Sequence, residues 1–174
     1  MKKIRICGLG GQGIILAGEI LGLAAVIEGK YATQMRSYGS EARGSACKSD
    51  IIISEKEIKY PVIDECDILI ALSQPALKKY VKTLKRGGIL IIDEDLIKKL
   101  PQEDNYKIYK IKATRIAEKR FRRIMANMFI LGYTSKKTGI IKIESLKKAV
   151  QERGIRMKEM NKKAIIEGSE LAEK

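Results

Sequence analysis

Short, continuous runs of hydrophobic residues recur along the chain, and longer stretches of helical character lie between them. The runs ILIAL and GILII have almost no polar position, as expected for strands that are covered on both faces of a sheet. The pattern therefore predicts strands at Ile4–Leu9, Tyr31–Met35, Ile51–Ser54, Ile68–Leu72, Ile89–Asp93 and Tyr106–Ile111.

Two helices are predicted between these strands. The first, Gly13–Ile27, is apolar along most of its length. The second, Gln74–Lys85, follows Ser73, whose hydroxyl suits a helix amino terminus, and has a proline in its first turn. Gly87 and Gly88 are expected just past its end. This alternation predicts an α/β fold, a three-layer sandwich with a mostly parallel, Rossmann-like sheet.

The last third of the chain is predicted to be helical. Helices are expected at Ile116–Leu131, at Ser145–Arg153, where Gly154 ends the helix, and at Met157–Leu171. Residues 1–174 show no internal repeat or long linker, so we expect a single domain. The final helix carries one stripe of apolar or small residues, which should pack on the same chain: Met157, Met160, Ala164, Gly168 and Leu171.

The composition is that of a folded globular protein, with 45% hydrophobic and 32% charged residues. No apolar run approaches the roughly 20 residues that span a bilayer. The first apolar run is about six residues long, too short for the core of a signal peptide. We therefore expect a cytoplasmic protein with no membrane partner.

The cysteines argue against a metal centre. Cys7, Cys47 and Cys66 are widely spaced, and the chain has no histidine. Zinc and iron–sulfur sites need clustered thiolates or imidazoles, so we expect no metal here and three buried, reduced thiols. The absence of histidine also removes the commonest general base near neutral pH.

The net charge of +14 raises the question of nucleic-acid binding. The basic residues are spread along the chain and interleaved with acidic ones, and two Phe and no Trp leave little to stack on bases. Only Thr114–Arg123 and Lys136-Lys137 are locally dense. The charge is interpreted as a solvated face, with an acidic partner or a phosphate-rich ligand as the alternative, and no nucleic acid.

A glycine-dense turn joins the first strand to the first helix. Such a turn aims backbone N–H groups at one point and adds the positive end of the helix dipole, which together favour an anion. Its spacing fits G-x-G-x-x-G, the pattern of a dinucleotide site. The candidate binding residues of the turn are Gly8, Gly10, Gly11, Gln12 and Gly13.

Residues 35–45 form a long polar segment without strand or helix periodicity, and such segments are often functional. Nicotinamide-binding folds carry an acidic residue at the end of the second strand, but this chain has Arg36 there. Arginine at this position disfavours NAD but suits the 2′-phosphate of NADP. The segment's candidate binding residues are Arg36, Ser37, Tyr38, Gly39, Glu41, Arg43 and Gly44; a solvated surface loop is the alternative.

Three stretches taken together carry a family resemblance: GLGGQG (8–13), YATQMRSYGSEARGS (31–45) and DIIIS (50–54). With ALSQP (71–75), GGILIID (87–93) and ANM (126–128) followed by LG (131–132), they resemble the gamma subunit of 2-oxoacid:ferredoxin oxidoreductases over residues 3–170. The segment SYGSEARG (37–44) is most similar to the 2-oxoglutarate type, and the branched-chain 2-oxoacid type is the nearest rival.

The resemblance implies an assembly with alpha, beta and delta subunits. Those enzymes decarboxylate a 2-oxoacid on thiamine diphosphate, transfer the acyl group to coenzyme A and pass electrons through iron–sulfur clusters to ferredoxin. Thiamine diphosphate and the clusters belong to the partner subunits, so this chain is expected to be non-catalytic alone. We hypothesise that the Gly10–Gly13 amides and Arg43 help to hold coenzyme A. A purely architectural role for the same residues has equal weight.

Two other functions remain open on sequence alone: a free-standing NADP-binding oxidoreductase and a nucleic-acid-binding module. The stretch Arg120–Arg123 departs from the family pattern and offers a docking site for an acidic subunit or ferredoxin. The isolated chain is expected to form a homo-oligomer through surfaces that partners would otherwise cover.

Overall fold

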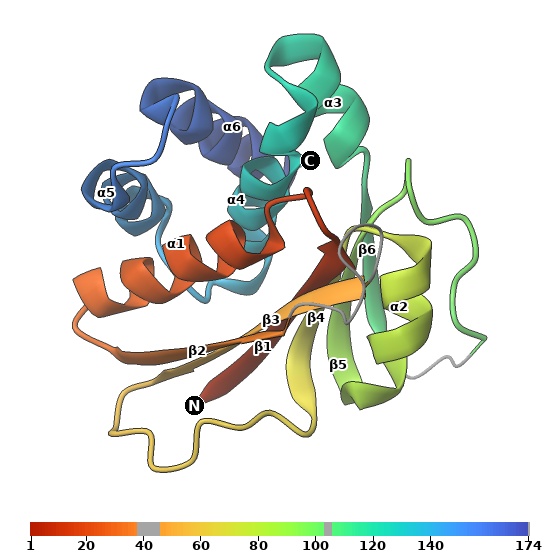
Figure 1. Cartoon of the computed structure of the whole chain (residues 1–174), viewed down its shortest axis with the longest axis vertical. Helices are drawn as coiled ribbons and strands as arrows, with labels where there is room; N and C mark the ends of the chain where they lie inside the picture. The colour runs from red at the N-terminus through yellow and green to blue at the C-terminus, as the bar shows by residue number, and fades with distance from the viewer. Residues whose placement is uncertain (38–45, 103–105, 174) are drawn as a thin grey trace.

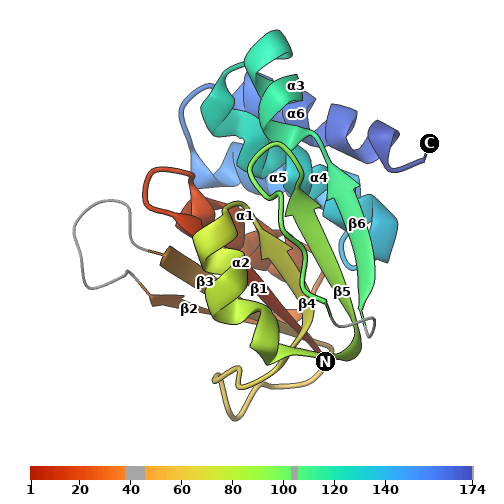
Figure 2. The same cartoon turned by 90° about the vertical axis from the view of Figure 1, so that its right-hand side faces the viewer.

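A computed structural model describes residues 1–37, 46–102 and 106–173. Within these residues a six-stranded sheet, in the order β2-β3-β1-β4-β5-β6, separates α2 from the other helices (Figure 1 and Figure 2). The strands are β1 (Lys2–Leu9), β2 (Tyr31–Ser37), β3 (Ala46–Ser54), β4 (Cys66–Ala71), β5 (Leu84–Asp93) and β6 (Lys107–Ile111). The helices are α1 (Ile14–Ile27), α2 (Gln74–Tyr80), α3 (Ala113–Arg120), α4 (Ala126–Thr138), α5 (Ile143–Arg153) and α6 (Lys158–Leu171).

Alternation along the strands builds a separate core on each face of the sheet. On one face Ile4 and Ile6 pack with α1 and the C-terminal helices, and on the other Cys7 packs with α2. Strands β1, β4, β5 and β6 run parallel, and β3 lies antiparallel to both β1 and β2. The predicted three-layer α/β sandwich with a mostly parallel sheet is confirmed.

The second predicted helix is too long. Ser73 caps α2 as expected, with its hydroxyl accepting the Ala76 N–H at 3.3 Å. The helix ends at Tyr80 and passes through a 3₁₀ turn into β5, so Gly87 and Gly88 lie inside a strand. The register shifts between the pairs Cys66–Leu84 and Ile68–Ile89, so residues 85–88 lie opposite Asp67 alone and β5 accommodates three extra residues. Long-range pairing with β4 overrides the local stop signal.

The predicted helix Ile116–Leu131 is two helices with a break. Phe121 leaves helical geometry at φ −137° and ψ −114°, and a 3₁₀ turn at Arg123–Met125 precedes α4. The break turns the chain so that α4 enters the core, where residues Ala126–Ser135 are all buried. Burying α4 on every side stabilises the fold more than one straight helix would, because a straight helix would continue along the exposed direction of α3.

Helices α4 and α6 cross at two glycines. A Cβ atom on Gly132 of α4 would overlap the carbonyl oxygen of Ile165, and one on Gly168 of α6 would overlap that of Phe129. Each helix thus presses a glycine against the other's backbone. Ala164 and Gly168 of the predicted stripe are buried, which confirms that it packs on this chain, whereas Met157 stays 40% exposed.

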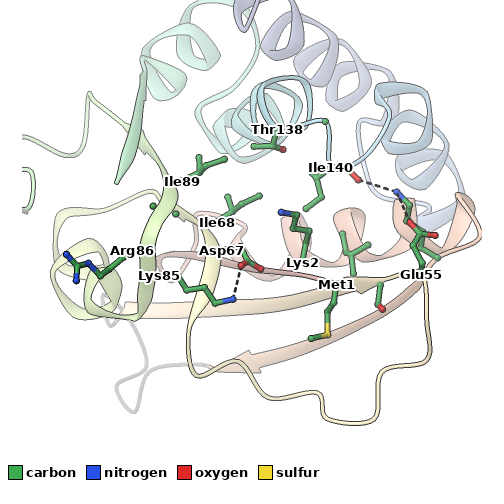
Figure 3. Close-up of a pocket in the computed structure, with 16 residues that line it drawn as sticks. Met1, Lys2, Glu55, Asp67, Ile68, Lys85, Arg86, Ile89, Thr138 and Ile140 are labelled. Atoms are coloured by element: carbon green, nitrogen blue, oxygen red, sulfur yellow. Dashed lines mark hydrogen bonds and ion pairs between the residues drawn. The ribbon is translucent and has the colours of Figure 1, made fainter. Parts of the chain in front are cut away.

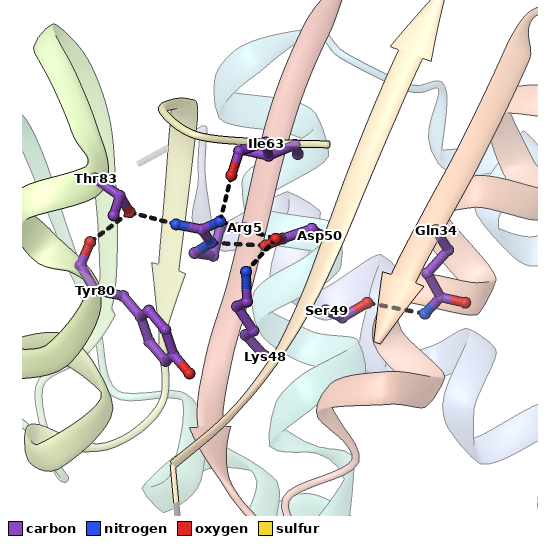
Figure 4. Close-up of polar contacts among 8 residues, drawn as sticks. All are labelled: Arg5, Gln34, Lys48, Ser49, Asp50, Ile63, Tyr80 and Thr83. Carbon is purple, nitrogen blue, oxygen red and sulfur yellow. Dashed lines mark hydrogen bonds and ion pairs between the residues drawn. The ribbon is translucent and has the colours of Figure 1, made fainter. Parts of the chain in front are cut away.

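The other face of the sheet contains a buried ion pair. Arg5 of β1 donates to Asp50 of β3 through Nε at 2.6 Å and Nη2 at 2.8 Å, and both side chains are almost fully buried. Its remaining donors bind Thr83 Oγ1 and the Ile63 carbonyl, and Lys48 also pairs with Asp50 (Figure 4). This network ties β1 and β3 to the segment before β4, at Ile63, and to the turn before β5, at Thr83.

We expect Gly132→Ala to lower the free energy of unfolding by about 1–3 kcal/mol, because the added methyl group would force α4 and α6 apart. Gly22 in α1 is the matched control, since it has a non-positive φ and open space around its Cβ position. Gly22→Ala should raise stability by about 0.5–1 kcal/mol through helix propensity. Urea denaturation measures both; equal effects would contradict the close crossing.

Removing Arg5 alone should leave the buried Asp50 carboxylate with Lys48, which is partly exposed, as its remaining cationic partner. We expect Arg5→Met to lower the free energy of unfolding by about 3–5 kcal/mol. The double variant Arg5→Met/Asp50→Leu should lose markedly less, because no buried carboxylate remains and the partly exposed Lys48 can turn its ammonium group to water. Urea unfolding of the two single variants and the double variant gives the coupling free energy; additive losses would show that the pair does not act as a unit.

Candidate functional site

The candidate site lies at the carboxyl edge of the sheet, between β1 and β4. Helix α1 follows β1 over one face, and α2 follows β4 over the other (Figure 2). Strands whose helices leave to opposite faces form a topological switch point, the usual ligand crevice of open α/β sheets. The glycine turn occupies this crevice.

The Gln12 side chain connects the two strand ends. Its Oε1 accepts the Leu9 N–H at 2.6 Å, and its Nε2 donates to the Leu72 carbonyl at 2.7 Å. The Gln12 N–H also donates to the Leu9 carbonyl, at 3.2 Å. Gln12 therefore holds the two strand ends together through both the oxygen and the nitrogen of its side-chain amide. Only the hydrogen-bonding capacity that these bonds leave unused is available to a ligand.

The four glycines of the turn have different surroundings. A Cβ on Gly8 would lie 2.5 Å from Gln12 Oε1 and 2.6 Å from Ile14 Cδ1, so packing excludes a side chain there. Gly13 has a φ of +70°, and a Cβ on it would overlap the Asn127 amide. At Gly10 and Gly11 no atom of the described residues lies within 4 Å of that position. The close approach of a ligand or a second chain is thus sterically open only at the middle of the turn.

The start of α1 has no side-chain cap among the described residues. Gly13 is its N-cap residue and supplies no side-chain hydrogen bond, and its first turn contains no acidic residue. The first N–H groups of a helix lack partners within the helix, and the dipole makes them attractive to anions. Asn127 Nδ2 donates to the Gly13 carbonyl at 3.1 Å, which holds the amino end of α4 beside this turn.

A pocket of about 260 Å³ opens beside the turn. Arg123 contributes the cationic group, is largely exposed, and lies 3.4 Å from Glu118. The polar lining could orient a ligand and the apolar part could cover it. The lining residues are Gly11, Gln12, Leu72, Thr114, Arg123, Ile124, Ala126 and Asn127.

Buried Asp93, at the carboxyl end of β5, positions the far wall of this pocket. Its Oδ2 accepts the Thr114 N–H at 2.9 Å and the Thr114 hydroxyl at 2.5 Å, and its Oδ1 accepts the Asp95 N–H at 3.1 Å. Burial raises the pKa of Asp93 above its ordinary value, although these hydrogen bonds favour the ionised form. Asp93 thereby anchors the start of α3 to the sheet.

Part of the predicted site lies elsewhere. Arg36 at the end of β2 pairs with Glu19 of α1 at 2.9 Å and lines a different groove, between α1 and β2. Ser37 is exposed and pairs with Lys48 in the sheet. The described chain resumes at Ala46, which pairs with Leu9 beside the turn. Five predicted residues, Tyr38, Gly39, Glu41, Arg43 and Gly44, lie outside the described residues.

The pairing of Arg36 with Glu19 weakens the NADP hypothesis, because the guanidinium is already neutralised away from the glycine turn.

Sequence reasoning missed Thr114 and Asn127 as lining residues and treated Arg123 only as part of a docking surface. The ANM stretch at 126–128 was the available signal for Asn127, since it recurs with the glycine turn in the family resemblance.

The three cysteines are free and buried, as predicted. Burial raises the pKa of Cys7 well above its usual range and that of Cys66 to about 11, so neither thiol is an activated nucleophile. Among the described residues no cluster of three or more acidic or cysteine side chains could hold a metal ion. The same residues include no helix long and apolar enough to cross a membrane.

The chain matches a known family over nearly its whole length. Residues 3–171 match the family described as pyruvate ferredoxin/flavodoxin oxidoreductase. The 2-oxoglutarate synthase subunit KorC of Methanothermobacter thermautotrophicus is 44% identical over 87% of this chain and 84% of its own length. The pyruvate/ketoisovalerate oxidoreductases common subunit gamma of Pyrococcus abyssi is 36% identical, over 87% of this chain and 86% of its own.

Solved structures agree with these relatives. One match is the gamma subunit of a keto/oxoacid ferredoxin oxidoreductase from Geobacter sulfurreducens, with a TM-score of 0.87 and 42% sequence identity. The alignment covers 99% of this chain and 98% of that subunit. The fold also matches 31% of a longer chain, from the 2-oxoglutarate:ferredoxin oxidoreductase of Magnetococcus marinus solved with 2-oxoglutarate, coenzyme A and succinyl-CoA. That match covers 99% of this chain at 23% identity and a TM-score of 0.86, and the likeness is one of fold.

Proposed function

Because the chain belongs to the pyruvate ferredoxin/flavodoxin oxidoreductase family, we propose that it is the gamma subunit of a multi-subunit 2-oxoacid:ferredoxin oxidoreductase whose 2-oxoacid is 2-oxoglutarate. The observation that carries the substrate choice is the higher identity to the KorC subunit, 44%, than to the pyruvate/ketoisovalerate subunit, 36%, at equal coverage of this chain. The chain, taken as one domain over residues 1–174, would work in the cytoplasm, a reducing compartment that suits three free thiols.

The catalytic groups are proposed to reside in partner subunits. Thiamine diphosphate would be held by the alpha and beta subunits and iron–sulfur clusters by the beta and delta subunits, with ferredoxin as the electron acceptor. This chain's side chains fit a supporting role, because its thiols are buried with raised pKa values and it has no histidine base.

The pocket beside the glycine turn is proposed to contact coenzyme A. Three features support this assignment: the uncapped start of α1, the open Gly10–Gly11 segment, and the exposed Arg123 guanidinium at the pocket. Together they offer backbone donors and one bidentate cation, which is the chemistry that recognises phosphate groups. Arg43 remains part of the proposal from its place in the sequence.

Exposed apolar side chains at the β2 edge of the sheet are proposed to contact a partner subunit. Val26 of α1 and Tyr31 and Met35 of the edge strand β2 are each more than 40% exposed. Large exposed hydrophobic side chains at an unpaired sheet edge favour association. The isolated chain is therefore expected to form a homo-oligomer when its partners are absent.

Purification of the chain from its native cells tests the assignment. We expect it to co-purify with thiamine diphosphate- and iron–sulfur-containing subunits, and the complex to reduce a viologen dye with 2-oxoglutarate only when coenzyme A is present. Pyruvate and 2-oxoisovalerate supplied in the same assay should give much lower kcat/KM. A complex that prefers 2-oxoisovalerate would correct the substrate, and recovery without such subunits would refute the function.

The coenzyme A contact is tested in the assembled complex with Arg123→Ala. Loss of a charge-assisted hydrogen bond predicts a rise of about tenfold in KM for coenzyme A, with KM for 2-oxoglutarate unchanged. Arg156→Ala is the matched control, because Arg156 is exposed and lies outside the pocket. Equal coenzyme A kinetics in the two variants would leave the glycine turn with an architectural role only.

A further inference from the structure

The edge strand β2 differs from β6, the strand at the opposite edge of the sheet (Figure 2). Strand β6 has exposed lysines at Lys107 and Lys110, and such charges discourage a free edge from pairing with another chain. Strand β2 contains no lysine, proline or register shift over Tyr31–Ser37. Among the described residues, no backbone hydrogen bond occupies its outer side. The β2 edge therefore lacks the features that protect β6.

The charges next to β2 are neutralised within the chain. Arg36, the one charged residue of β2, pairs with Glu19 of α1 at 2.9 Å. Lys30, directly before the strand, pairs with Glu28 at 2.9 Å and lies 4.0 Å from Glu55, beside a cavity at the amino edge of the sheet (Figure 3). The five residues between these two cations carry no charge. A second strand can thus approach this stretch without burying an unpaired ion.

Apolar side chains remain exposed on both faces of this edge. Tyr31 and Met35 lie on one face of β2, since they are an even number of residues apart, and they are 52% and 43% exposed. On the other face, Val26 of α1 is 54% exposed beside a groove of about 330 Å³, which α1 forms with Ala32 and Gln34 of β2. Helix α1 is apolar on nearly all sides, as is typical of helices that are buried all round.

We propose that β2 pairs antiparallel with β2 of a second copy of this chain, about a two-fold axis at Thr33. In this register Tyr31 of each copy lies opposite Met35 of the other, and the two Thr33 side chains lie opposite each other. Pairs of an aromatic with an apolar side chain, and of two threonines, stabilise antiparallel strands. The edge is thus complementary to itself, which a two-fold interface requires. The proposal rests on the homo-oligomer proposed for the isolated chain and specifies its interface.

The same axis places both α1 helices on one face of the joined sheet. The groove lies on the outer side of α1, because its strand residues all come from β2 and none from β3. It therefore faces the second copy. Gly22 lines the groove, and no described atom lies within 4 Å of its Cβ position, which leaves space for a side chain of the second copy. Pairing of the strands would thus also cover Val26.

Sedimentation equilibrium of the full isolated chain tests the pairing. We expect a monomer–dimer equilibrium, and Tyr31→Glu or Met35→Lys alone should raise the dissociation constant about tenfold or more, because each brings a charge against an apolar side chain twice by symmetry. The double variant Tyr31→Glu/Met35→Lys should recover the dimer, since the introduced opposite charges face each other across the axis. The matched control, Tyr31→Lys/Met35→Lys, should stay monomeric because like charges then face each other.

Three outcomes would contradict the proposal. A chain that stays monomeric up to about 1 mM has no more than a weak encounter at this edge. A dimer that resists the single β2 changes, or that dissociates instead with Ile124→Glu at an exposed residue outside β2 and α1, has its interface elsewhere. Failure of the opposite-charge variant to recover the dimer excludes the register. None of these results affects the enzyme assignment, which co-purification of the complex tests separately.

Discussion

The contact between Gly13 and Asn127 joins the glycine turn at the sheet to the C-terminal helices. Gly13 begins α1 in a left-handed conformation, and the Asn127 amide fills the space that any side chain would need. Asn127 donates to the Gly13 carbonyl and accepts from the Met128 N–H, so one side chain links the glycine turn to the first turn of α4. Since α4 is buried and crosses α6 at two glycines, the placement of the C-terminal helices depends on this junction.

The carboxyl and amino edges of the sheet differ in electrostatic character. At the carboxyl edge, the first N–H groups of α1 have no side-chain cap among the described residues, and the Gln12 amide hydrogen-bonds the strand ends. At the amino edge, the parallel strands begin among lysine and arginine side chains that are interleaved with the carboxylates Asp67 and Glu55. The basic side chains at this edge therefore lie among acidic ones, as the interleaved charges of the sequence predict.

Local patterns predicted most of the fold. The predicted strands, several of them continuous hydrophobic runs, overlap all six strands of the structure, and Ser73 and Gly154 marked helix ends that the structure confirms. The break after Arg120 and the extra residues in β5 were missed, because both arise from packing against segments distant in sequence. The glycine turn was predicted as a site because it is a local pattern in the sequence. Thr114 and Asn127, more than 100 residues away, were not predicted, because only packing between distant segments brings them to the turn.

The glycine spacing itself has an explanation that needs no dinucleotide. The first glycine of the G-x-G-x-x-G pattern, Gly8, makes room for Gln12 and Ile14, and the last, Gly13, makes room for Asn127. Gly10 and Gly11 do neither and face open space. A dinucleotide site and this turn therefore share glycines at the same spacing for different steric reasons. Because the protein's own side chains occupy both ends of the motif, a ligand or partner can approach its backbone closely only at Gly10–Gly11.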